Sequence, residues 1–224
     1  MEKVEVFENK RATGYNEFVG AWIPNYSYFL SKLPDLLSET KNKDLLVAGC
    51  GTGNEIVCFV KNSKQWSITG VDPSPEMIIQ AKEKLKNYNN VNLIKGVVSD
   101  VEKTHKFGAA TLLLVLHFMK DDGTKLSLLK SIAERLESNA PFVLLDITGT
   151  KKQLKDNLQV LKQLLPNNLT EEDINNRFYR IENELNAVSE ERLSELLIEA
   201  GFEAPVRFFQ TSIYMGWITK KWEN

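Results

Sequence analysis

Three glycines and one aspartate carry the clearest chemical signal in this sequence. Gly49, Gly51 and Gly53 alternate with other residues directly after the apolar run 45–47. Glycine tolerates positive φ and has no Cβ, so this spacing predicts a turn whose backbone a ligand can approach closely. Asp72 follows about twenty residues later, the separation at which an acidic side chain accepts ribose hydroxyls in nucleotide-binding folds. Together these residues predict a site for a ligand that contains a ribose.

The residues after the turn argue against two common phosphate-binding sites. A P-loop ends in Gly-Lys-Ser/Thr, but Gly53 is followed by Asn54 and Glu55. A dinucleotide fingerprint would place its third glycine at Asn54, so the spacing also disfavours nicotinamide and flavin dinucleotides. An adenosyl ligand without a pyrophosphate fits this turn better, because no large anion has to be bound.

The flanking segments predict how these groups are positioned. The apolar run 45–47 suits a parallel strand that is covered on both faces, and residues 67–71 predict a second strand that ends at Asp72. A helix from Asn54 onward would point its N-terminal amides toward the ligand.

Two segments resemble motif I and the following acidic motif of class I S-adenosylmethionine-dependent methyltransferases: Val-Ala-Gly-Cys-Gly-Thr-Gly (47–53) and Gly-Val-Asp-Pro-Ser-Pro-Glu-Met (70–77). The resemblance, of the methyltransferase type 11/12 kind, continues through residues 112–118, similar to the fourth strand of the family, and 200–202, similar to the end of its last helix. It implies an α/β, Rossmann-like fold with a seven-stranded, mostly parallel sheet, an antiparallel C-terminal hairpin and helices on both faces. It also implies S-adenosylmethionine (SAM) as the cofactor.

The resemblance implies a set of cofactor-binding residues from five segments of the chain: Tyr15, Tyr26, Gly49, Cys50, Gly51, Asp72, Pro73, Met77, Val98, Asp100, Leu114 and Val115. Met77 has two interpretations, packing under the adenine or filling the core. Val97 stands where the family usually has the acidic residue that meets the adenine amino group, so this contact is assigned to the backbone near Val98 or to Asp100. For Tyr15 and Tyr26, a lid over the cofactor and a packing stripe in the core are equally open.

His117 is the candidate catalytic residue, because it ends the apolar run 107–119 at the sheet edge where open α/β folds bind ligands and titrates near neutral pH. A structural histidine is the alternative. The two cysteines, Cys50 and Cys58, lack the number and spacing of a zinc site, so no metal site is predicted.

The chain is divided into an N-terminal helical lid segment, residues 1–43, and a methyltransferase domain, residues 44–224, with a helical insertion at about 149–187. The insertion holds Arg177, which falls within a residue of an arginine that the distantly similar carboxy-S-adenosylmethionine synthases keep for a carboxylate of their cofactor. A guanidinium matches a carboxylate bidentately, and a solvated arginine is the alternative.

Composition narrows the choice of partners. With 224 residues, 42% of them hydrophobic, and a formal net charge of −2, the chain is expected to form one domain without overall attraction to nucleic acid or anionic membrane. The Asn/Asp-Pro-Pro-Tyr motif of DNA amino-methyltransferases is replaced by Val-Leu-His-Phe at 115–118. We therefore expect a cytoplasmic enzyme that methylates a small-molecule acceptor. A carboxy-SAM synthase-like or tRNA-modification-related enzyme, a non-catalytic SAM-binding protein and a homodimeric state stay open as alternatives.

Overall fold

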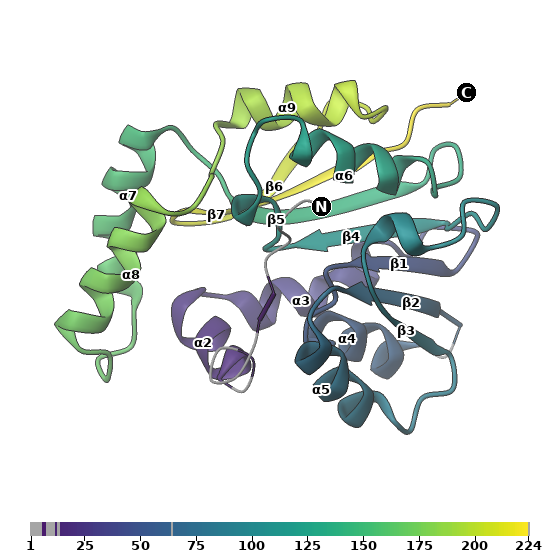
Figure 1. Ribbon diagram of the computed structural model, residues 1–224, viewed down its shortest axis with the longest axis horizontal. Coiled ribbons are helices and arrows are strands. Elements are labelled where there is room, and N and C mark those ends of the chain that lie inside the picture. Colours follow the sequence, from purple (N-terminus) through teal and green to yellow (C-terminus); the bar gives the residue numbers. More distant parts are fainter. Residues whose placement is uncertain (1–5, 8–11, 13, 64, 224) are drawn as a thin grey trace.

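A computed structural model describes residues 6–7, 12, 14–63 and 65–223 of the chain. Its centre is one seven-stranded sheet with the strand order β3-β2-β1-β4-β5-β7-β6 (Figure 1). The strands are β1 (Asp44–Ala48), β2 (Ser67–Asp72), β3 (Val91–Lys95), β4 (Ala109–Leu113), β5 (Pro141–Ile147), β6 (Val206–Thr211) and β7 (Tyr214–Lys220).

The first five strands are parallel, and β7 runs antiparallel between β5 and β6. The register pairs Val47 of β1 with Gly70 of β2 on one side and with Thr111 of β4 on the other. This confirms the predicted mostly parallel sheet with an antiparallel C-terminal hairpin. Because β1 is central, its carboxyl end, where the glycine turn begins, lies at the middle of the sheet edge.

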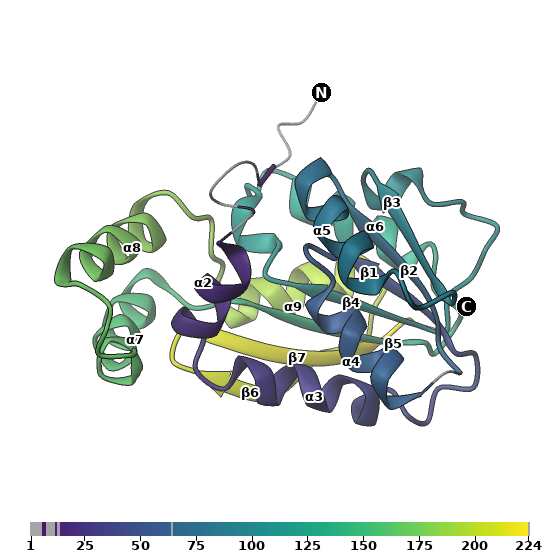
Figure 2. The same cartoon turned by 90° about the horizontal axis from the view of Figure 1, so that it is seen from below.

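Helices cover both faces of the sheet. On one face lie α3 (Tyr26–Leu36), α4 (Asn54–Asn62) and α5 (Pro75–Leu85), whose buried apolar residues, except Met77, belong to one core cluster. On the other face, α6 (Thr124–Ala133) and α9 (Glu190–Glu199) bury Leu129, Ile132, Leu193 and Leu196 in a second cluster. In Figure 1, α6 and α9 lie above the sheet and α3, α4 and α5 lie below it, and Figure 2 views the molecule from below.

The remaining helices gather beyond one end of the sheet. They are α2 (Tyr15–Trp22), α7 (Lys151–Leu164) and α8 (Glu171–Asn183), and both views place α7 and α8 together on the far side of α2 (Figures 1 and 2). Thr150 and Thr170 begin α7 and α8 with capping boxes to Gln153 and Asp173. These side chains satisfy amide groups of the first turn that have no partner within the helix.

Two boundaries differ from the sequence-based expectation. The predicted strand over 107–119 ends at Leu113, because Leu114 adopts a φ of 62° and the chain turns into the short 3-10 helix η2 (Leu116–Phe118). Pro24, a residue type that favours the first turn of a helix, lies instead in the turn between α2 and α3, and α3 begins at Tyr26 after Asn25 at a φ of 62°. The first difference moves His117 out of the strand and onto a separate turn.

Candidate functional site

The glycine turn at the carboxyl end of β1 adopts the predicted conformation. Gly49, Gly51 and Gly53 have φ angles of 68°, 50° and 78°. A Cβ at Gly49 would lie 2.5 Å from Cγ2 of Val115. The amides of Gly49 and Cys50 both donate to the carbonyl of Val71, over 2.8 and 3.0 Å. The turn therefore requires glycine for its backbone angles and, at Gly49, also for space.

Asp72 joins this turn to the end of β2. Its Oδ2 accepts the amide of Gly51 over 2.9 Å, and its Oδ1 accepts the amide of Ser74 over 2.8 Å. The residue is 7% exposed, and burial raises the pKa of its carboxyl while these two amide bonds lower it. Each carboxylate oxygen can accept more than one hydrogen bond. Asp72 thus fixes the turn and keeps acceptor capacity for ligand hydroxyls.

The other predicted cofactor residues lie on both sides of this turn. Met77 and Val98 are buried, Met77 on α5 and Val98 in the 3-10 helix η1 (Val98–Asp100). Pro73 is partly buried beside Asp72. Asp100 is exposed, and its Oδ2 accepts the amide of Val97 over 2.8 Å. The Asp100 carboxylate is therefore directed at its own loop.

Helix α2 packs onto the glycine turn. A Cβ at Gly51 would lie 3.8 Å from Cε1 of Tyr15, so the Tyr15 ring lies directly against the turn. Asn16 Oδ1 accepts hydrogen bonds from Thr52 Oγ1 over 2.7 Å and from Asn54 Nδ2 over 2.8 Å. These contacts hold α2 over the site.

Tyr15 and Tyr26 have different surroundings. Tyr15 is partly buried, whereas Tyr26 is 8% exposed and belongs to the apolar core. Burial, with the nearby carboxyl groups of Glu55 and Asp72, raises the pKa of Tyr15, and burial also raises that of Tyr26. Both phenols therefore stay neutral at physiological pH.

A cavity of about 280 Å³ opens next to the turn, between α2, η2, α8 and β7. Its lining is largely aromatic and apolar, with two arginines and one histidine: Phe7, Gly14, Tyr15, Phe18, Val19, Ile23, Leu114, His117, Phe118, Arg177, Arg180 and Tyr214. The guanidinium of Arg177 lies 4.8 Å from the centre of the Phe18 ring. Among the described residues, Arg177 Nε and Tyr214 OH are buried without a hydrogen-bond partner. Such orphaned polar atoms are costly unless a ligand or water satisfies them.

His117 is held on this cavity wall by a buried carboxylate that our sequence analysis did not identify. Its Nδ1 lies 2.8 Å from Oδ1 of Asp146, and both side chains are 3% exposed. Asp146, next to last in β5, also accepts the amides of Val115, Leu116 and His117, at 3.1, 2.8 and 3.1 Å, and that of Ile147 at 2.8 Å. A carboxylate that accepts four amides requires Nδ1 of the imidazole to carry a hydrogen. No hydrogen bond from the described residues engages Nε2. The available signal for Asp146 was an acidic residue near the carboxyl end of a predicted strand.

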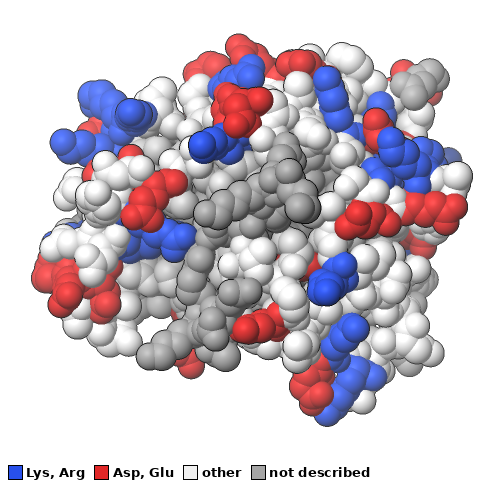
Figure 3. Space-filling model, viewed as in Figure 1, with Lys and Arg blue, Asp and Glu red and all other residues white. Residues whose placement is uncertain are grey.

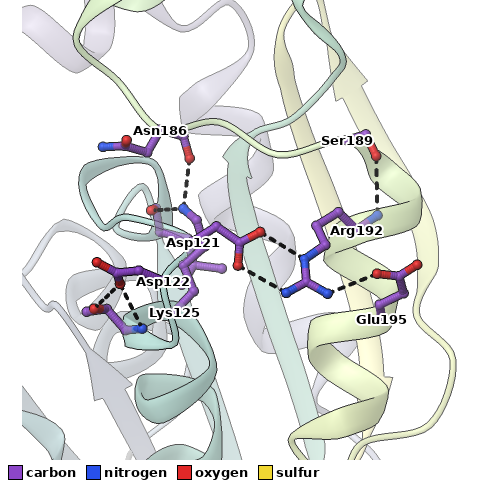
Figure 4. A network of polar contacts seen from close by, with 9 residues as sticks. Asp121, Asp122, Lys125, Asn186, Ser189, Arg192 and Glu195 are labelled. Atoms are coloured by element: carbon purple, nitrogen blue, oxygen red, sulfur yellow. Dashed lines mark hydrogen bonds and ion pairs between the residues drawn. The ribbon is translucent and has the colours of Figure 1, made fainter.

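A second polar network fixes the backbone that carries His117 (Figure 4). Lys125 is completely buried, and its Nζ donates to the carbonyls of Leu116 and Asn186. The amide of Asn186 in turn donates to the carbonyl of His117 over 2.7 Å. Nearby, Arg192 binds both carboxylate oxygens of Asp121, at 2.8 and 3.2 Å. The segment that follows α8 is thereby attached to η2.

Side chains of both charges lie on the surface. Acidic and basic side chains are interspersed on the face seen in Figure 3. In the part of the chain that the structure describes, no group of three or more His, Cys, Asp or Glu could hold a metal ion. No described helix is both long enough and apolar enough to cross a membrane.

Comparisons with known proteins agree with this geometry. A family model described as a methyltransferase domain matches residues 46–142, which span the glycine turn, Asp72 and His117. Together with the similar proteins below, this match supports a class I S-adenosylmethionine-dependent methyltransferase. The carboxy-S-adenosyl-L-methionine synthase 1 of Yersinia pseudotuberculosis is 24% identical over 229 residues, covering 96% of this chain and 92% of the relative.

Two solved methyltransferases show the same fold. A putative O-methyltransferase from Nostoc punctiforme superposes with a TM-score of 0.69 at 16% identity, over 95% of this chain and 61% of that one. The plantazolicin methyltransferase BpumL was solved in complex with a triazolic desmethylPZN analog and S-adenosylhomocysteine (SAH). It gives a TM-score of 0.70 at 12% identity, over 96% of this chain and 92% of that one. The chain thus spans about three fifths of the first solved structure and nearly all of the second.

Proposed function

We propose that this methyltransferase transfers a methyl group from SAM to a small-molecule acceptor bound in the cavity beside the glycine turn. One observation carries the proposal: the turn that Asp72 holds through Gly51 is adjacent to an aromatic-lined cavity of about 280 Å³ with His117 on its wall. This volume is close to the lower end of the range for small-ligand pockets.

The residues of the turn fit an adenosyl cofactor. At Gly51 a Cβ would meet only Cε1 of Tyr15, at 3.8 Å, so this glycine leaves room for a ligand to approach the backbone, and Asp72 has acceptor capacity for ribose hydroxyls. We assign Met77, Pro73 and the backbone at Val98 to the adenine side. Asp100 is the weaker candidate, because its carboxylate already accepts the Val97 amide.

On the other side of the turn, we assign Tyr15, Gly51, Cys50, Leu114 and Val115 to the amino-acid end of the cofactor. Tyr15 lies against Gly51, and Val115 lies against Gly49. Tyr26 is buried below, and we assign it to the support of α2 and α3 beneath the site.

SAM supplies a methyl group on an activated sulfonium, so the protein contributes mainly by holding the acceptor close and aligned. An acceptor that carries a proton also needs a base. We assign this role to His117, whose Nε2 is available while Asp146 fixes Nδ1. Histidine in this tautomer accepts a proton at Nε2, and the resulting imidazolium is stabilised by the Asp146 carboxylate.

A second candidate function is a reaction of the carboxy-SAM synthase type. It is favoured by two buried donors on the cavity wall that have no hydrogen-bond partner, Arg177 Nε and Tyr214 OH. A ligand carboxylate would accept hydrogen bonds from both. The Yersinia relative bears that name at 24% identity.

Ligand identification tests both candidates. The purified protein is extracted and its bound nucleosides are identified by mass spectrometry, and calorimetry compares SAM, SAH and NAD. We expect binding of SAM and SAH, with methylated product and SAH formed from a panel of small acceptors. Carboxy-SAM in the extract would favour the second function, and binding of NAD alone would refute both.

A further inference from the structure

Glu55 is a buried carboxyl directly behind the glycine turn. It is the second residue of α4, is 4% exposed, and accepts a hydrogen bond from Thr111 Oγ1 on β4 over 2.5 Å. Thr111 pairs with Val47, which lies two residues before Gly49. The Glu55 carboxyl is therefore placed beneath the turn, on the side of the sheet that α3 and α4 cover.

The groups around Glu55 supply no positive charge. The titratable side chains that interact with it electrostatically are Tyr15 of α2, Tyr26 of α3, Cys50 of the turn and Cys58 of α4. Burial raises the pKa of each of these four groups, so all four are neutral at pH 7. Among the described residues, no lysine, arginine or histidine forms an ion pair with Glu55.

A second acidic group lies on the opposite flank of the turn. Asp72 lacks a cationic partner among the described residues as well, and it accepts the backbone amides of Gly51 and Ser74. Tyr15, which packs against Gly51, interacts with both carboxyls. Lys84 of α5 donates to Thr52 Oγ1 over 3.1 Å and to Asn54 Oδ1 over 2.5 Å, but among the described residues it forms no ion pair with Glu55 or Asp72. A turn with an acidic group on each flank, neither of them ion-paired, favours a ligand that brings positive charge.

We propose that Glu55 is a specificity-determining residue that makes this site prefer the cationic cofactor SAM over its uncharged-sulfur product SAH. The proposal rests on the proposed function. SAM and SAH have the same adenosine, amino and carboxylate groups and differ by the methyl group that makes the sulfur a sulfonium. A carboxylate beneath the turn attracts that extra charge and has no comparable effect on the thioether. Glu55 therefore favours substrate binding and product release.

Protonation of Glu55 makes this preference depend on pH. Burial raises the pKa of Glu55 to about 8, although the Thr111 hydrogen bond lowers it. Below about pH 8 the carboxyl is neutral, and a bound cation lowers its pKa, so SAM binding releases a proton and becomes tighter as pH rises. Above about pH 8 the carboxylate is already formed and the preference reaches a plateau. The amino group of each ligand also titrates in this range, and the sulfonium lowers its pKa in SAM, so the contribution of Glu55 is the difference between the wild type and a variant without this carboxyl.

The test measures the dissociation constants of SAM and SAH by calorimetry from pH 6 to 9.5. In the wild type, we expect the ratio Kd(SAH)/Kd(SAM) to increase with pH and to level off above about pH 8, with a slope of at most tenfold per pH unit. Glu55→Gln removes the titration of this carboxyl and should make the ratio smaller and its dependence on pH weaker, with only the part due to the ligand amino groups remaining. Glu83→Gln, the same change at an exposed residue of α5 that pairs with Lys86, serves as the control and should behave like the wild type.

Two further measurements keep the proposal testable if Glu55→Gln does not fold. Calorimetry of the wild type in buffers of different ionisation enthalpy at pH 7.5 should show more protons released on binding SAM than on binding SAH. Thr111→Val removes the hydrogen bond that lowers the Glu55 pKa, so the midpoint of the pH dependence should move upward.

The outcomes separate the two proposals. A wild type that binds neither ligand overturns the proposed function and, with it, the role of Glu55. A wild type that binds both with a pH-independent ratio, or a Glu55→Gln variant that keeps the wild-type ratio and slope, overturns only the role of Glu55.

Discussion

The proposed site has two halves, one assigned to the cofactor and one to the acceptor, and they are built differently. The cofactor half, from Gly49 to Asp72, is made of backbone amides and glycines, and its central contact joins Gly51 to Asp72 across 21 residues. The acceptor half is made of side chains from α2, η2, α8 and β7, which lie far apart in the sequence. Backbone geometry on adjacent parallel strands fixes one ligand, whereas side chains on added segments can change without altering the sheet. This explains how a common cofactor turn accompanies many acceptors.

Replacing His117 is expected to have the largest effect, and it separates the halves. His117→Gln should lower kcat by about 10²–10⁴ for an acceptor that loses a proton, because the base is removed, while SAM affinity changes little. Asp146→Asn should lower kcat as well, since it disturbs the tautomer. The measurements are initial rates of SAH formation as a function of pH and SAM binding by calorimetry. An unchanged kcat with an acidic acceptor such as a phenol would show that His117 is structural.

Gly49→Ala should damage the cofactor half most. The new Cβ would lie 2.5 Å from Val115 Cγ2 at a φ of 68°, and positive φ alone costs a non-glycine residue about 1–2 kcal/mol. We expect SAM affinity to fall by roughly 100-fold, with a lower melting temperature. Gly20→Ala is the matched control, because Gly20 lies in α2 with no atom within 4 Å of the new Cβ and alanine favours the helix. Wild-type affinity in the Gly49 variant would show that the turn is not at the ligand.

Asp72→Asn should weaken SAM and SAH binding by roughly 1.5–3 kcal/mol, as expected for hydrogen bonds to a charged group. Because asparagine can still accept the Gly51 amide, the melting temperature should fall less than in the Gly49 variant. Calorimetry with SAH and with an analogue that lacks the ribose hydroxyls measures the effect. An equal loss for both ligands would place Asp72 outside the ribose contact.

Asn16→Ala tests the smallest effect, the attachment of the acceptor half to the cofactor half. It removes the acceptor of the bonds from Thr52 and Asn54, each worth about 0.5–1.5 kcal/mol. The free energy of unfolding should fall modestly and the acceptor KM should rise more than the SAM Kd. Asn89→Ala, on the exposed surface after α5, is the control. A matched change in both constants would mean that α2 supports the two ligands equally.

The sequence predicted the backbone of the glycine turn and the position of Asp72 well because their signal is local. Glycine spacing reports backbone angles directly, and Asp72 follows from the end of a strand that pairs with β1. Asp146 was missed because its partner His117 lies 29 residues away, and no short pattern records that contact. The end of β4 was placed too late for the same reason: the apolar run continues to Phe118, but the amides after Leu114 are captured by Asp146 on β5. The limits of the lid segment 1–43 and the assigned site residues stay predictions.

The position of β7 has a consequence for synthesis of the protein. β7 follows every other strand in the sequence, yet it pairs with both β5 and β6. A chain that emerges from the ribosome N-terminus first therefore presents β5 as an uncovered edge until residues 214–220 arrive. At about 5–20 residues per second, the roughly 70 intervening residues take roughly 4–15 s. During that interval the glycine turn and Asp72 have already been made, whereas Tyr214 has not. The residues of the glycine turn are thus made before the last residue that lines the cavity, and the edge of β5 stays unpaired until β7 is made.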